Sequence, residues 1–513
     1  MEIAAVAALA PNRLAVSSAQ GELTFKELND QCNQLAKLLG DAGVSAGDAV
    51  ALVCSNREEF VVVRFACHRL GVRLTPVNWH LAPEELRYIV ENCDAKALIL
   101  ECDICSEATA RALANNSALL LKLAVGGTIP EFRSWRESLS CCSTEDIKGP
   151  SLGHTMLYTS GTTGRPKGVL RKQADPQKAA DMQALLTAVF QFQPETGNDK
   201  ALITGPLYHA GPFNLCMTTP LTSGIGVVIM EKFLPESVLD LIAKHRISHT
   251  FFVPTMMSRL LNLAVGRKEG ADVSSVRFII HGAAPCPVET KRGMLAWFGP
   301  ILWEMFAGTE GPGTMVSPQE WLLKPGTVGK PGPGQIRVLD EHYQELAAGE
   351  EGQLYISNPE DSSFEYYRDT EKTARALRHG FYTAGDIGYL DEDGYLFLTG
   401  RSAEVIISGG VNIYPQEIDD VLITHLAVED VACVGVPNED WGEEVKALVQ
   451  LQRGQKPCAE LECEILDYCA GKLASQKLPR SVDFVVEIPR SEAGKIARKS
   501  LRDAFWKERG SSI

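Results

Sequence analysis

Apolar residues along the first 300 positions follow two alternating patterns. Over residues 24–43 they recur at helical spacing behind Thr24, which suits an N-cap, and over 49–53 they form a short unbroken run typical of a buried strand. The same exchange continues in a helix at 58–70 and in strands at 72–77, 200–204, 225–230, 249–253 and 276–280. Strands separated in this way by helices predict parallel sheets covered by helices.

The texture of the chain changes near residue 326, where glycine, proline and shorter alternating strands begin to dominate. This predicts a small β-rich subdomain. Beyond Gly400 a compact α+β unit is expected, and Arg401 marks the natural cut. Its predicted elements are strands near 431–436, 445–451 and 482–486 and a helix across 459–473. We therefore predict an α/β protein with a large N-terminal domain over 1–400, which includes the β-rich subdomain, and a small α+β C-terminal domain over 401–513.

Length and charge narrow the class of protein. A chain of 513 residues is too long for one compact core, so two or more domains are expected. The 50 basic and 65 acidic residues give a net charge of −15, which argues against nucleic acid as a partner. The apolar segment 3–10 lacks a basic flank and stops at Pro11, so it predicts an amphipathic first helix rather than a signal peptide. No other apolar run is long enough for a transmembrane segment.

The 14 cysteines are scattered from Cys32 to Cys469. The CxxC at 102–105 has no second pair, and the vicinal pair at 141–142 does not suit a structural bridge. We therefore expect core thiols in a cytoplasmic protein, where the environment is reducing.

The densest chemical signal is the segment 158–168, YTSGTTGRPKG, which follows a β-branched strand. Glycines let the backbone approach a ligand closely, and hydroxyl groups and lysine are donors to phosphate oxygens. It is not a Walker A loop, because Lys167 stands between Pro166 and Gly168. The candidate phosphate-binding residues are Thr159, Ser160, Gly161, Thr162, Thr163, Gly164 and Lys167.

Two further segments follow apolar strands. Residues 205–213, GPLYHAGPF, hold Tyr208 and His209 between glycines, and such a pair at a strand end can gate or floor a pocket; a solvated loop is the alternative. In 279–287 small side chains leave room for a flat ligand to lie against the backbone. The small residues are Gly282, Ala283, Ala284 and Pro285.

Residues 304–311, EMFAGTEG, combine three useful side chains in one loop. Phe306 can stack on a base, Thr309 can contact a carboxylate or phosphate, and Glu310 can hold Mg²⁺. An acid beside the cationic 158–168 loop would make a metal–phosphate clamp.

The last signals lie in the C-terminal third. Asp386 sits in a glycine-flanked turn, where a carboxylate can accept both hydroxyls of a ribose. The segment 400–419 starts with Arg401 and carries a Gly-Gly turn at 409–410. Lys495 follows Gly494 before a basic helical end; alone it would be interpreted as a solvated charge.

These strings, in this order, resemble the adenylate-forming superfamily, which includes acyl-CoA synthetases, peptide-synthetase adenylation domains and beetle luciferases. The resemblance covers nearly the whole chain. It implies a large N-terminal domain that binds ATP and an acid, and a small mobile C-terminal domain that rotates over it. It also implies a cytoplasmic enzyme that is a monomer or a homodimer.

The resemblance implies roles for particular residues. The loop from Thr159 to Lys167 would bind phosphate, and Gly282, Ala283, Ala284, Pro285 and Phe306 would form the adenine site, with Phe306 where the family usually has tyrosine. Thr309 would contact the substrate carboxylate and α-phosphate, Glu310 would ligate Mg²⁺, and Asp386, with Arg401 nearby, would bind the ribose. His209 would lie at the acid, and Lys495 would bridge carboxylate and phosphate.

The implied reaction has two halves. A carboxylate attacks the α-phosphate of ATP to give acyl-AMP and pyrophosphate, and positioning and charge neutralisation are enough for this step. The C-terminal domain then turns, removes Lys495 and presents Ser408, Gly409 and Gly410 to the pantetheine of coenzyme A, whose thiol displaces AMP. The usual hinge residue of the family is Asp or Lys, but this chain has Ala403, which predicts a changed balance between the two states.

A carboxylic acid–CoA ligase is the leading functional hypothesis. The alternatives are an enzyme that loads an acyl or aminoacyl group onto a carrier protein, a luciferase-like oxidase, and a non-catalytic sensor on the same scaffold. An amino-acid substrate is disfavoured because 205–213 contains no acid. The expected pocket segments 205–213, 253–260 and 281–285 are mostly apolar, although His209 and His281 could pair with a second carboxylate. We therefore expect a hydrophobic monocarboxylate, either a medium- or long-chain fatty acid or a bulky cyclic or sterol-derived acid.

Overall fold

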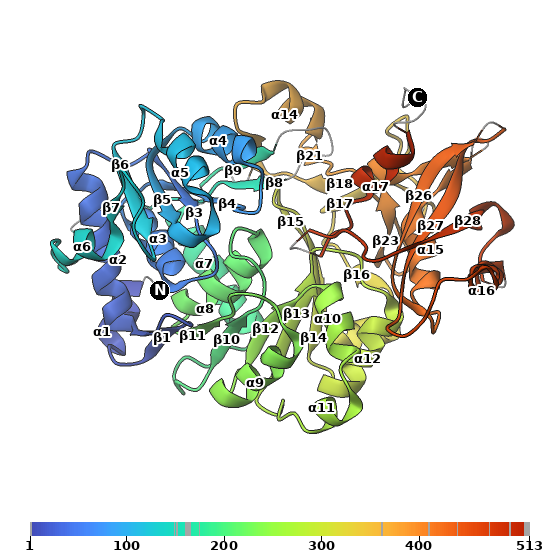
Figure 1. Ribbon diagram of the computed structural model, residues 1–513, viewed down its shortest axis with the longest axis horizontal. Coiled ribbons are helices and arrows are strands. Elements are labelled where there is room, and N and C mark those ends of the chain that lie inside the picture. The colour runs from blue at the N-terminus through green and yellow to red at the C-terminus, as the bar shows by residue number, and fades with distance from the viewer. Residues whose placement is uncertain are drawn as a thin grey trace.

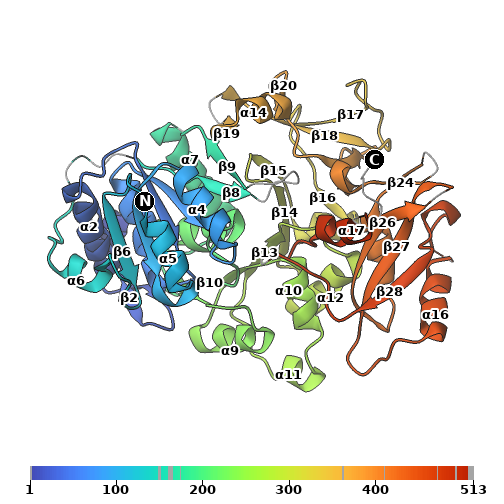
Figure 2. The same ribbon diagram turned by 45° about the horizontal axis from the view of Figure 1, so that its top comes forward.

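The computed structural model describes residues 3–147, 149, 152–159, 166–173, 175–360, 363–408, 411–438, 440–470, 472–491 and 494–506. Helix-covered sheets form the N-terminal part, and the orange and red C-terminal elements form a body beside them (Figure 1). The view in Figure 2 keeps the strands of residues 327–401 next to that C-terminal body. The predicted α/β class is confirmed.

The first sheet has five parallel strands. In spatial order they are β4 (Arg73–Val77), β3 (Ala49–Val53), β5 (Ala95–Glu101), β6 (Leu121–Val125) and β7 (Arg133–Ser134). Its helices are α2 (Phe25–Asp41), α3 (Glu58–Arg69), α4 (Pro83–Asn92), α5 (Glu107–Ala114) and α6 (Trp135–Ser140). All of β3 is buried, as its apolar run predicts. Thr24 caps α2 as predicted, because its hydroxyl accepts from the Glu27 amide and its own amide donates to the Glu27 carboxylate at 2.8 Å.

The second sheet has eight strands, parallel except at its two edges. Their order is β15 (Pro312–Val316), β14 (Leu302–Ala307), β13 (Phe278–Gly282), β12 (His249–Phe252), β10 (Lys200–Ile203), β11 (Gly226–Ile229), β1 (Leu14–Ser17) and β2 (Glu22–Thr24). The strand predicted at 276–280 lies two residues later, as β13. It extends through His281, which is polar and yet buried, so the sequence did not indicate where the strand ends. One continuous core joins apolar residues of both sheets.

The helices of this second region complete the N-terminal part. They are α1 (Ile3–Leu9), α7 (Pro176–Val189), a π-helix (Pro212–Thr218), α8 (Thr219–Thr222), α9 (Pro235–His245), α10 (Pro254–Leu261), α11 (Val265–Glu269), α12 (Val288–Phe298) and α13 (Pro318–Leu323). The short α1 buries Ile3, Val6 and Ala7, in agreement with an amphipathic first helix.

The predicted β-rich region is present as an antiparallel sheet. It contains β16 (Thr327–Gly329), β23 (Leu396–Arg401), β22 (Asp386–Leu390), β18 (Gly352–Ser357), β21 (Phe381–Tyr382), β20 (Leu377–Arg378) and, paired with β18, β17 (Ile336–Leu339). A separate three-stranded sheet has the order β19 (Phe364–Tyr366), β9 (Lys167–Arg171) and β8 (Leu157–Thr159). Helix α14 (Thr370–Ala376) follows β19. The 158–168 segment is thereby joined to a strand two hundred residues later.

The C-terminal residues form a sheet with its own core. Its strands are β25 (Val411–Ile413), β24 (Ile406–Ser408), β27 (Gly442–Leu451), β26 (Val428–Asn438) and β28 (Ser481–Val485). Its helices are α15 (Pro415–Leu422), α16 (Ala459–Ala470) and α17 (Arg498–Trp506). The strands predicted at 431–436 and 445–451 fall inside β26 and β27, while the predicted helix 459–473 ends earlier, at Ala470.

The structure shows how the cysteines are buried and how long and apolar the helices are. Half of the cysteines are buried, whereas Cys141, Cys458 and Cys463 are exposed, so the expectation of core thiols holds for only part of the set. No helix among the described residues is both long and apolar enough to cross a membrane.

Candidate active site

Four neighbouring parallel strands, β14, β13, β12 and β10, end at the same edge of the second sheet. Ligands of open α/β sheets bind outside such carboxyl ends. The predicted segments 205–213, 282–285 and 308–311 begin at the ends of β10, β13 and β14, so the topology brings them to one place. Periodicity alone could not show this, because strand order is a tertiary property.

The base of the predicted phosphate loop is a strand pair. Thr159 ends β8, Lys167 begins β9, and the two are register partners. The chain therefore leaves and re-enters this sheet at adjacent positions, as a hairpin does. Ser160, Gly161, Thr162, Thr163 and Gly164 lie outside the described residues.

Lys167 lies in surroundings that disfavour its charge. Burial and the neighbouring Lys372 lower its pKa to about 8, although Glu310 and Asp369 oppose the shift. Its Nζ is 4.9 Å from the centre of the Tyr366 ring, but it forms no ion pair among the described residues. A lysine in this state gains most from an incoming oxyanion, which would restore its ordinary pKa.

Tyr366 connects Lys167 to Glu310. Its hydroxyl donates to Glu310 Oε1 at 3.0 Å, and both burial and the charge of Glu310 raise the pKa of Tyr366, so it remains a donor at neutral pH. Tyr366 is not among the residues predicted from the sequence, because nothing in its FEYY context marks it. Its position in β19, beside β9, is what makes it part of the site.

Glu310 is the candidate metal ligand. It is partly exposed, and the described residues contain no group of three or more potential metal-binding side chains. A single carboxylate nevertheless fits Mg²⁺, which usually keeps several waters and takes its other ligands from substrate phosphates. Thr309 is likewise partly exposed, so both side chains remain open to a ligand.

The two predicted halves of the adenine site lie on adjacent strands. Gly282 ends β13 opposite Met305 of β14, and a Cβ on Gly282 would come within 2.4 Å of the Met305 carbonyl oxygen, so the close pairing requires glycine. Ala283 has a φ of 70°, a left-handed conformation that costs a non-glycine residue about 1 kcal/mol and is found at functional sites. Phe306 is partly buried one residue beyond Met305.

Asp386 and Arg401 form an ion pair at the site. They are register partners on β22 and β23, and Arg401 Nε lies 2.9 Å from Asp386 Oδ1. The Asp386 charge raises the pKa of Arg401. The antiparallel pairing therefore explains why two residues fifteen positions apart act as one unit.

His209 lies in the segment after β10. Burial and the charge of Lys495 lower its pKa to about 4, so the ring is neutral at pH 7. Its Nε2 has no hydrogen-bond partner among the described residues. The segment is closely packed rather than a solvated loop, since a Cβ on Gly205 would lie 2.7 Å from Pro212. The π-helix that follows is a form often found at functional sites.

Lys495 reaches this edge from the C-terminal part. A Cβ on the preceding Gly494 would come within 2.6 Å of Thr255 Oγ1, so this turn packs directly against the start of α10. Burial and Arg401 lower the pKa of Lys495, while Asp386, Glu310 and Glu404 oppose the shift, although solvent still reaches the side chain. The fold therefore brings Lys495 within electrostatic reach of His209, Glu310, Asp386 and Arg401.

Other predicted residues have different surroundings. Ser408 pairs with Val411 and Gly442 in its own C-terminal sheet, and Gly409 and Gly410 lie outside the described residues. His281 is fully buried with its Nε2 3.5 Å from Glu304, so it faces the interior rather than a second substrate carboxylate. Met257, in the expected pocket segment 253–260, is also fully buried.

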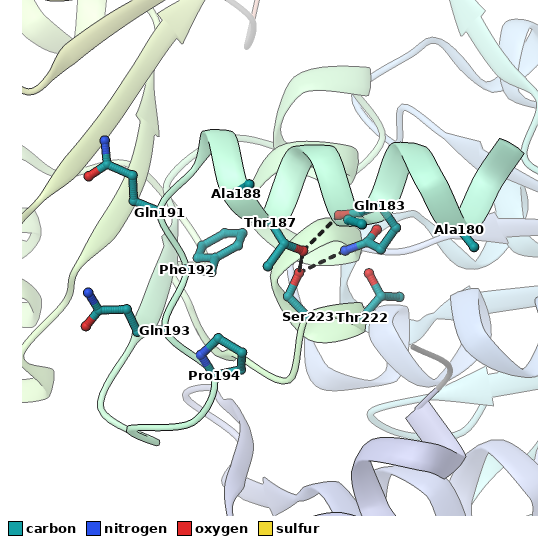
Figure 3. Close-up of a pocket in the computed structure, with 11 residues that line it drawn as sticks. Ala180, Gln183, Thr187, Ala188, Gln191, Phe192, Gln193, Pro194, Thr222 and Ser223 are labelled. Carbon is teal, nitrogen blue, oxygen red and sulfur yellow. Dashed lines mark hydrogen bonds between the residues drawn. The ribbon is translucent and has the colours of Figure 1, made fainter.

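A separate cavity of about 590 Å³ opens between α7 and α8 (Figure 3). Gln183 and Thr187 both hydrogen-bond to Ser223 Oγ across it, each at 2.8 Å. None of the predicted site residues lines this cavity. It is thus distinct from the strand-end site.

Two family models match the chain. That of the AMP-binding enzymes matches residues 3–367, and that of the AMP-binding enzyme C-terminal domain matches residues 417–495. The chain is 30% identical over 505 residues to an indoleacetate–CoA ligase of Aromatoleum aromaticum, covering 97% of this chain and 96% of that protein. It is 32% identical over 492 residues to a fatty acid–acyl-carrier-protein ligase of Streptomyces coeruleorubidus, covering 94% and 92%.

A solved structure agrees with these matches. The anthranilate CoA ligase AuaEII in complex with anthranoyl-AMP aligns with a TM-score of 0.87 at 25% identity, covering 98% of this chain and 97% of that chain. The chain belongs to the adenylate-forming superfamily of AMP-binding enzymes.

Proposed function

We propose that this acid–thiol ligase of the adenylate-forming superfamily joins a hydrophobic monocarboxylate to coenzyme A at the expense of ATP. One observation carries the proposal. Lys495, from the C-terminal part, shares an electrostatic environment with Glu310, Asp386, Arg401 and His209 from the N-terminal part. A site assembled in this way supplies cations and acceptors where an acid and a nucleotide must meet.

In the first half-reaction the substrate carboxylate attacks the α-phosphorus of ATP, and the bond to the bridging oxygen breaks to release pyrophosphate. Lys167 and the loop before it would hold the β- and γ-phosphates, and its lowered pKa supports this role because an oxyanion would restore its charge. Lys495 and Thr309 would orient the carboxylate and the α-phosphate. Glu310, fixed by Tyr366, would ligate Mg²⁺, which neutralises phosphate charge when bound.

The remaining nucleotide contacts follow from the same geometry. Asp386 would accept the ribose hydroxyls, with Arg401 holding its carboxylate at 2.9 Å. The adenine would lie between the small residues after Gly282 and the ring of Phe306. Both elements are preorganised by strand pairing, so little entropy is lost when the nucleotide binds.

In the second half-reaction the thiol of coenzyme A attacks the acyl carbon, the carbon–sulfur bond forms, and AMP leaves. We propose that residues 401–513 rotate as a domain to allow this, as the separation of two half-reactions requires. The rotation would withdraw Lys495 and bring Ser408, Gly409 and Gly410 to the thiol. Ala403 is the proposed pivot.

The proposed substrate is a hydrophobic acid with a ring. His209 is neutral and α10 next to it is largely buried, so nothing there favours a second substrate charge. Two relatives are named for ring-bearing acids, indoleacetate and anthranilate, which favours bulky cyclic acids over straight fatty chains within the expected class. A carrier-protein thiol as acceptor is the second candidate, because one relative of 32% identity is named as a carrier-protein ligase.

The test is a screen by ATP–pyrophosphate exchange over aromatic, sterol-like and fatty acids, followed by trapping with coenzyme A or with a phosphopantetheinylated carrier protein. We expect exchange with ring-bearing monocarboxylates and thioester formation with coenzyme A. Exchange with charged dicarboxylates alone would overturn the substrate class. Thioester formed only on the carrier protein would replace the first candidate by the second.

A further inference from the structure

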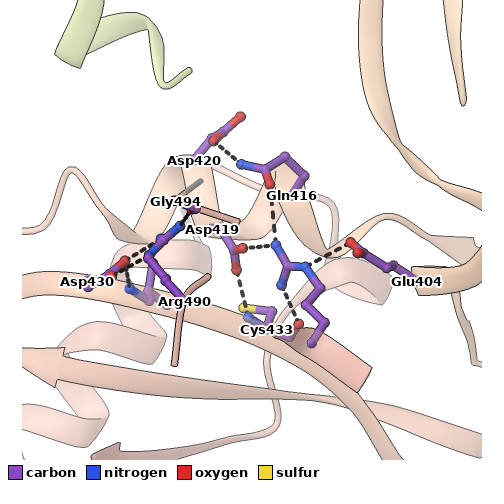
Figure 4. A network of polar contacts seen from close by, with 10 residues as sticks. Glu404, Gln416, Asp419, Asp420, Asp430, Cys433, Arg490 and Gly494 are labelled. Carbon is purple, nitrogen blue, oxygen red and sulfur yellow. Dashed lines mark hydrogen bonds and ion pairs between the residues drawn. The ribbon is translucent and has the colours of Figure 1, made fainter. Parts of the chain in front are cut away.

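Arg498 opens helix α17, three residues after Lys495, and is one of the most buried cations of the described chain at 6% exposure. Its guanidinium collects partners from three elements. Figure 4 shows this polar network, with Glu404, Gln416, Asp419 and Cys433 labelled. Its contacts are Glu404 Oε2 at 3.0 Å from Nε, the carbonyl of Cys433 at 2.7 Å from Nη1, Gln416 Oε1 at 3.3 Å from Nη2, and the Asp419 carboxylate.

The network keeps the buried guanidinium of Arg498 charged. Burial alone would lower the pKa of Arg498, but Asp419 and Glu404 outweigh it and raise that pKa, so the guanidinium stays ionised. Charge-assisted hydrogen bonds of this kind are stronger than neutral ones and fix geometry. Glu404 is therefore tied to the interior of the C-terminal body, although its side chain remains 34% exposed.

Glu404 also belongs to the connection between the two parts of the chain. On the N-terminal side, Arg401 is held by Asp386, and the amide of Ser402 donates to the carbonyl of Gly385 at 2.8 Å. On the C-terminal side, Glu404 is held by Arg498. Between them stands Ala403, which is exposed.

The turn that carries Lys495 is anchored to the same strand as Arg498. Arg490 forms two bonds of 2.7 Å with the Asp430 carboxylate of β26 and donates to the Gly494 carbonyl at 2.8 Å. Arg498 binds the Cys433 carbonyl, also on β26. Glu404 and the Lys495 turn are thus fixed to one rigid strand.

We propose that Arg498 is a positioning residue. By holding Glu404 it sets the C-terminal limit of the hinge at Ala403, and by binding β26 it fixes the position of Lys495. This role rests on the proposed function, because the hinge matters for chemistry only in an enzyme that alternates between two half-reactions. With both ends of the connection held by charged pairs, rotation is confined to the backbone torsions next to Ala403. Without the Glu404–Arg498 pair, more backbone torsions beside Ala403 could rotate, and Lys495 would be positioned less accurately in the site.

Glu404→Gln is the main test, because it keeps the shape of the side chain and removes its charge at a partly exposed position. Arg498→Lys is the second variant, which retains the charge but loses the fork of donors. Lys446→Met is the matched control, since Lys446 pairs with Asp483 at 2.8 Å in the same C-terminal sheet and far along the chain from the hinge. Melting temperatures of all variants show whether they fold as the wild type does.

Two measurements are needed. The rate of trypsin cleavage after Arg401 in the native protein reports the freedom of the hinge, and single-turnover rates of acyl-AMP formation and of coenzyme A transfer from supplied acyl-AMP report the two half-reactions. We expect Glu404→Gln to speed cleavage several-fold and to slow acyl-AMP formation about tenfold with an unchanged KM for ATP, since small misplacements of a catalytic group are costly. Transfer from supplied acyl-AMP should change less, and Lys446→Met should match the wild type in both measurements.

Cleavage and acyl-AMP formation at wild-type rates in Glu404→Gln would overturn the proposal, as would an equal effect in Lys446→Met. Failure of the proposed function looks different. A wild-type protein that forms no acyl-AMP from any acid contradicts that function, whereas the cleavage comparison still decides whether the Glu404–Arg498 pair restrains the hinge.

Discussion

Lys291 in α12 is fully buried, and its Nζ lies 2.7 Å from Glu304 Oε2 and 4.7 Å from the centre of the Trp321 ring. Lys495 lies at the end of the same sheet, yet in the described part of the chain it forms no ion pair, and only more distant carboxylates oppose the lowering of its pKa. The first lysine is compensated by the fold itself. The second has no such compensation in the described part of the chain, and we propose that a bound substrate supplies it.

Lys495→Ala is expected to have the largest effect on activity. If Lys495 neutralises charge that develops during adenylation, we expect acyl-AMP formation to fall about 10³-fold, the effect of removing a donor from a preorganised site. Transfer of a supplied acyl-AMP to coenzyme A and the melting temperature should stay near wild type. Rapid-quench measurement of both steps checks this, and equal losses in the two steps would contradict the assigned role.

Replacing Lys291, the lysine that the fold compensates, should instead reduce stability. Lys291→Met leaves Glu304 buried without its partner, and we expect a loss of about 3 kcal/mol in stability, since breaking a buried pair costs more than replacing it. Burial already lowers the pKa of Lys291 and raises that of Glu304, so neither ion is tolerated alone. Thermal melting checks the loss, and the double variant Lys291→Met/Glu304→Leu should recover much of it.

Asp420 extends the comparison to a partly buried carboxylate that forms no ion pair among the described residues. Burial, together with the charges of Asp419 and Glu417, raises its pKa to about 7. Gln416, which donates to it at 2.7 Å, and Arg498 oppose this shift. Because the folded pKa is above the unfolded value, ionisation costs stability as pH rises from about 4 to 7, and the cost is complete above 7.

Asp420→Asn should therefore stabilise the protein at pH 8 by about 2 kcal/mol and have little effect near pH 4. The measurement is the melting temperature of both proteins across this range. Asp467→Asn, on the exposed side of α16, is the control and should show no such trend. A difference that stays constant with pH would contradict the raised pKa.

The smallest effect is expected from Tyr366→Phe, which removes the hydrogen bond to Glu310 but keeps the ring beside Lys167. Loss of one charge-assisted bond should cost about 1 kcal/mol, seen as a roughly five-fold higher Mg²⁺ requirement in pyrophosphate exchange. Tyr367→Phe is the matched control, because its hydroxyl binds Asp94 at 2.7 Å, away from the site. Equal behaviour of the two variants would contradict the role of Tyr366.

Much of the fold could be predicted from local pattern. The N-cap at Thr24, the buried run of β3 and the strands inside β26 and β27 follow from side-chain periodicity and capping chemistry, which depend on neighbours in sequence. The predicted range of strand β13 was two residues too early, because the strand extends through His281, which is polar and yet buried. The domain boundary at residue 400 and the roles of the site residues stay predictions.

Some residues of the candidate site could likewise be predicted from local sequence, whereas others could not. The segment 158–168 and the loop with Thr309 and Glu310 carry their chemistry in adjacent residues, so they could be found without a structure. Tyr366 and Arg498 could not, because a lone tyrosine or arginine has no local signature and each acquires its role from a partner far along the chain.

Local sequence was enough to predict the class of fold, a candidate phosphate-binding loop and the resemblance to adenylate-forming enzymes, since each depends on short runs of residues. Which charges meet depends instead on how the chain packs. Lys291 meets Glu304, Arg498 meets Glu404, and Lys495 meets no counterion among the described residues. The physical reason is that an electrostatic interaction depends on distance and burial, and both are set by packing rather than by position in the chain.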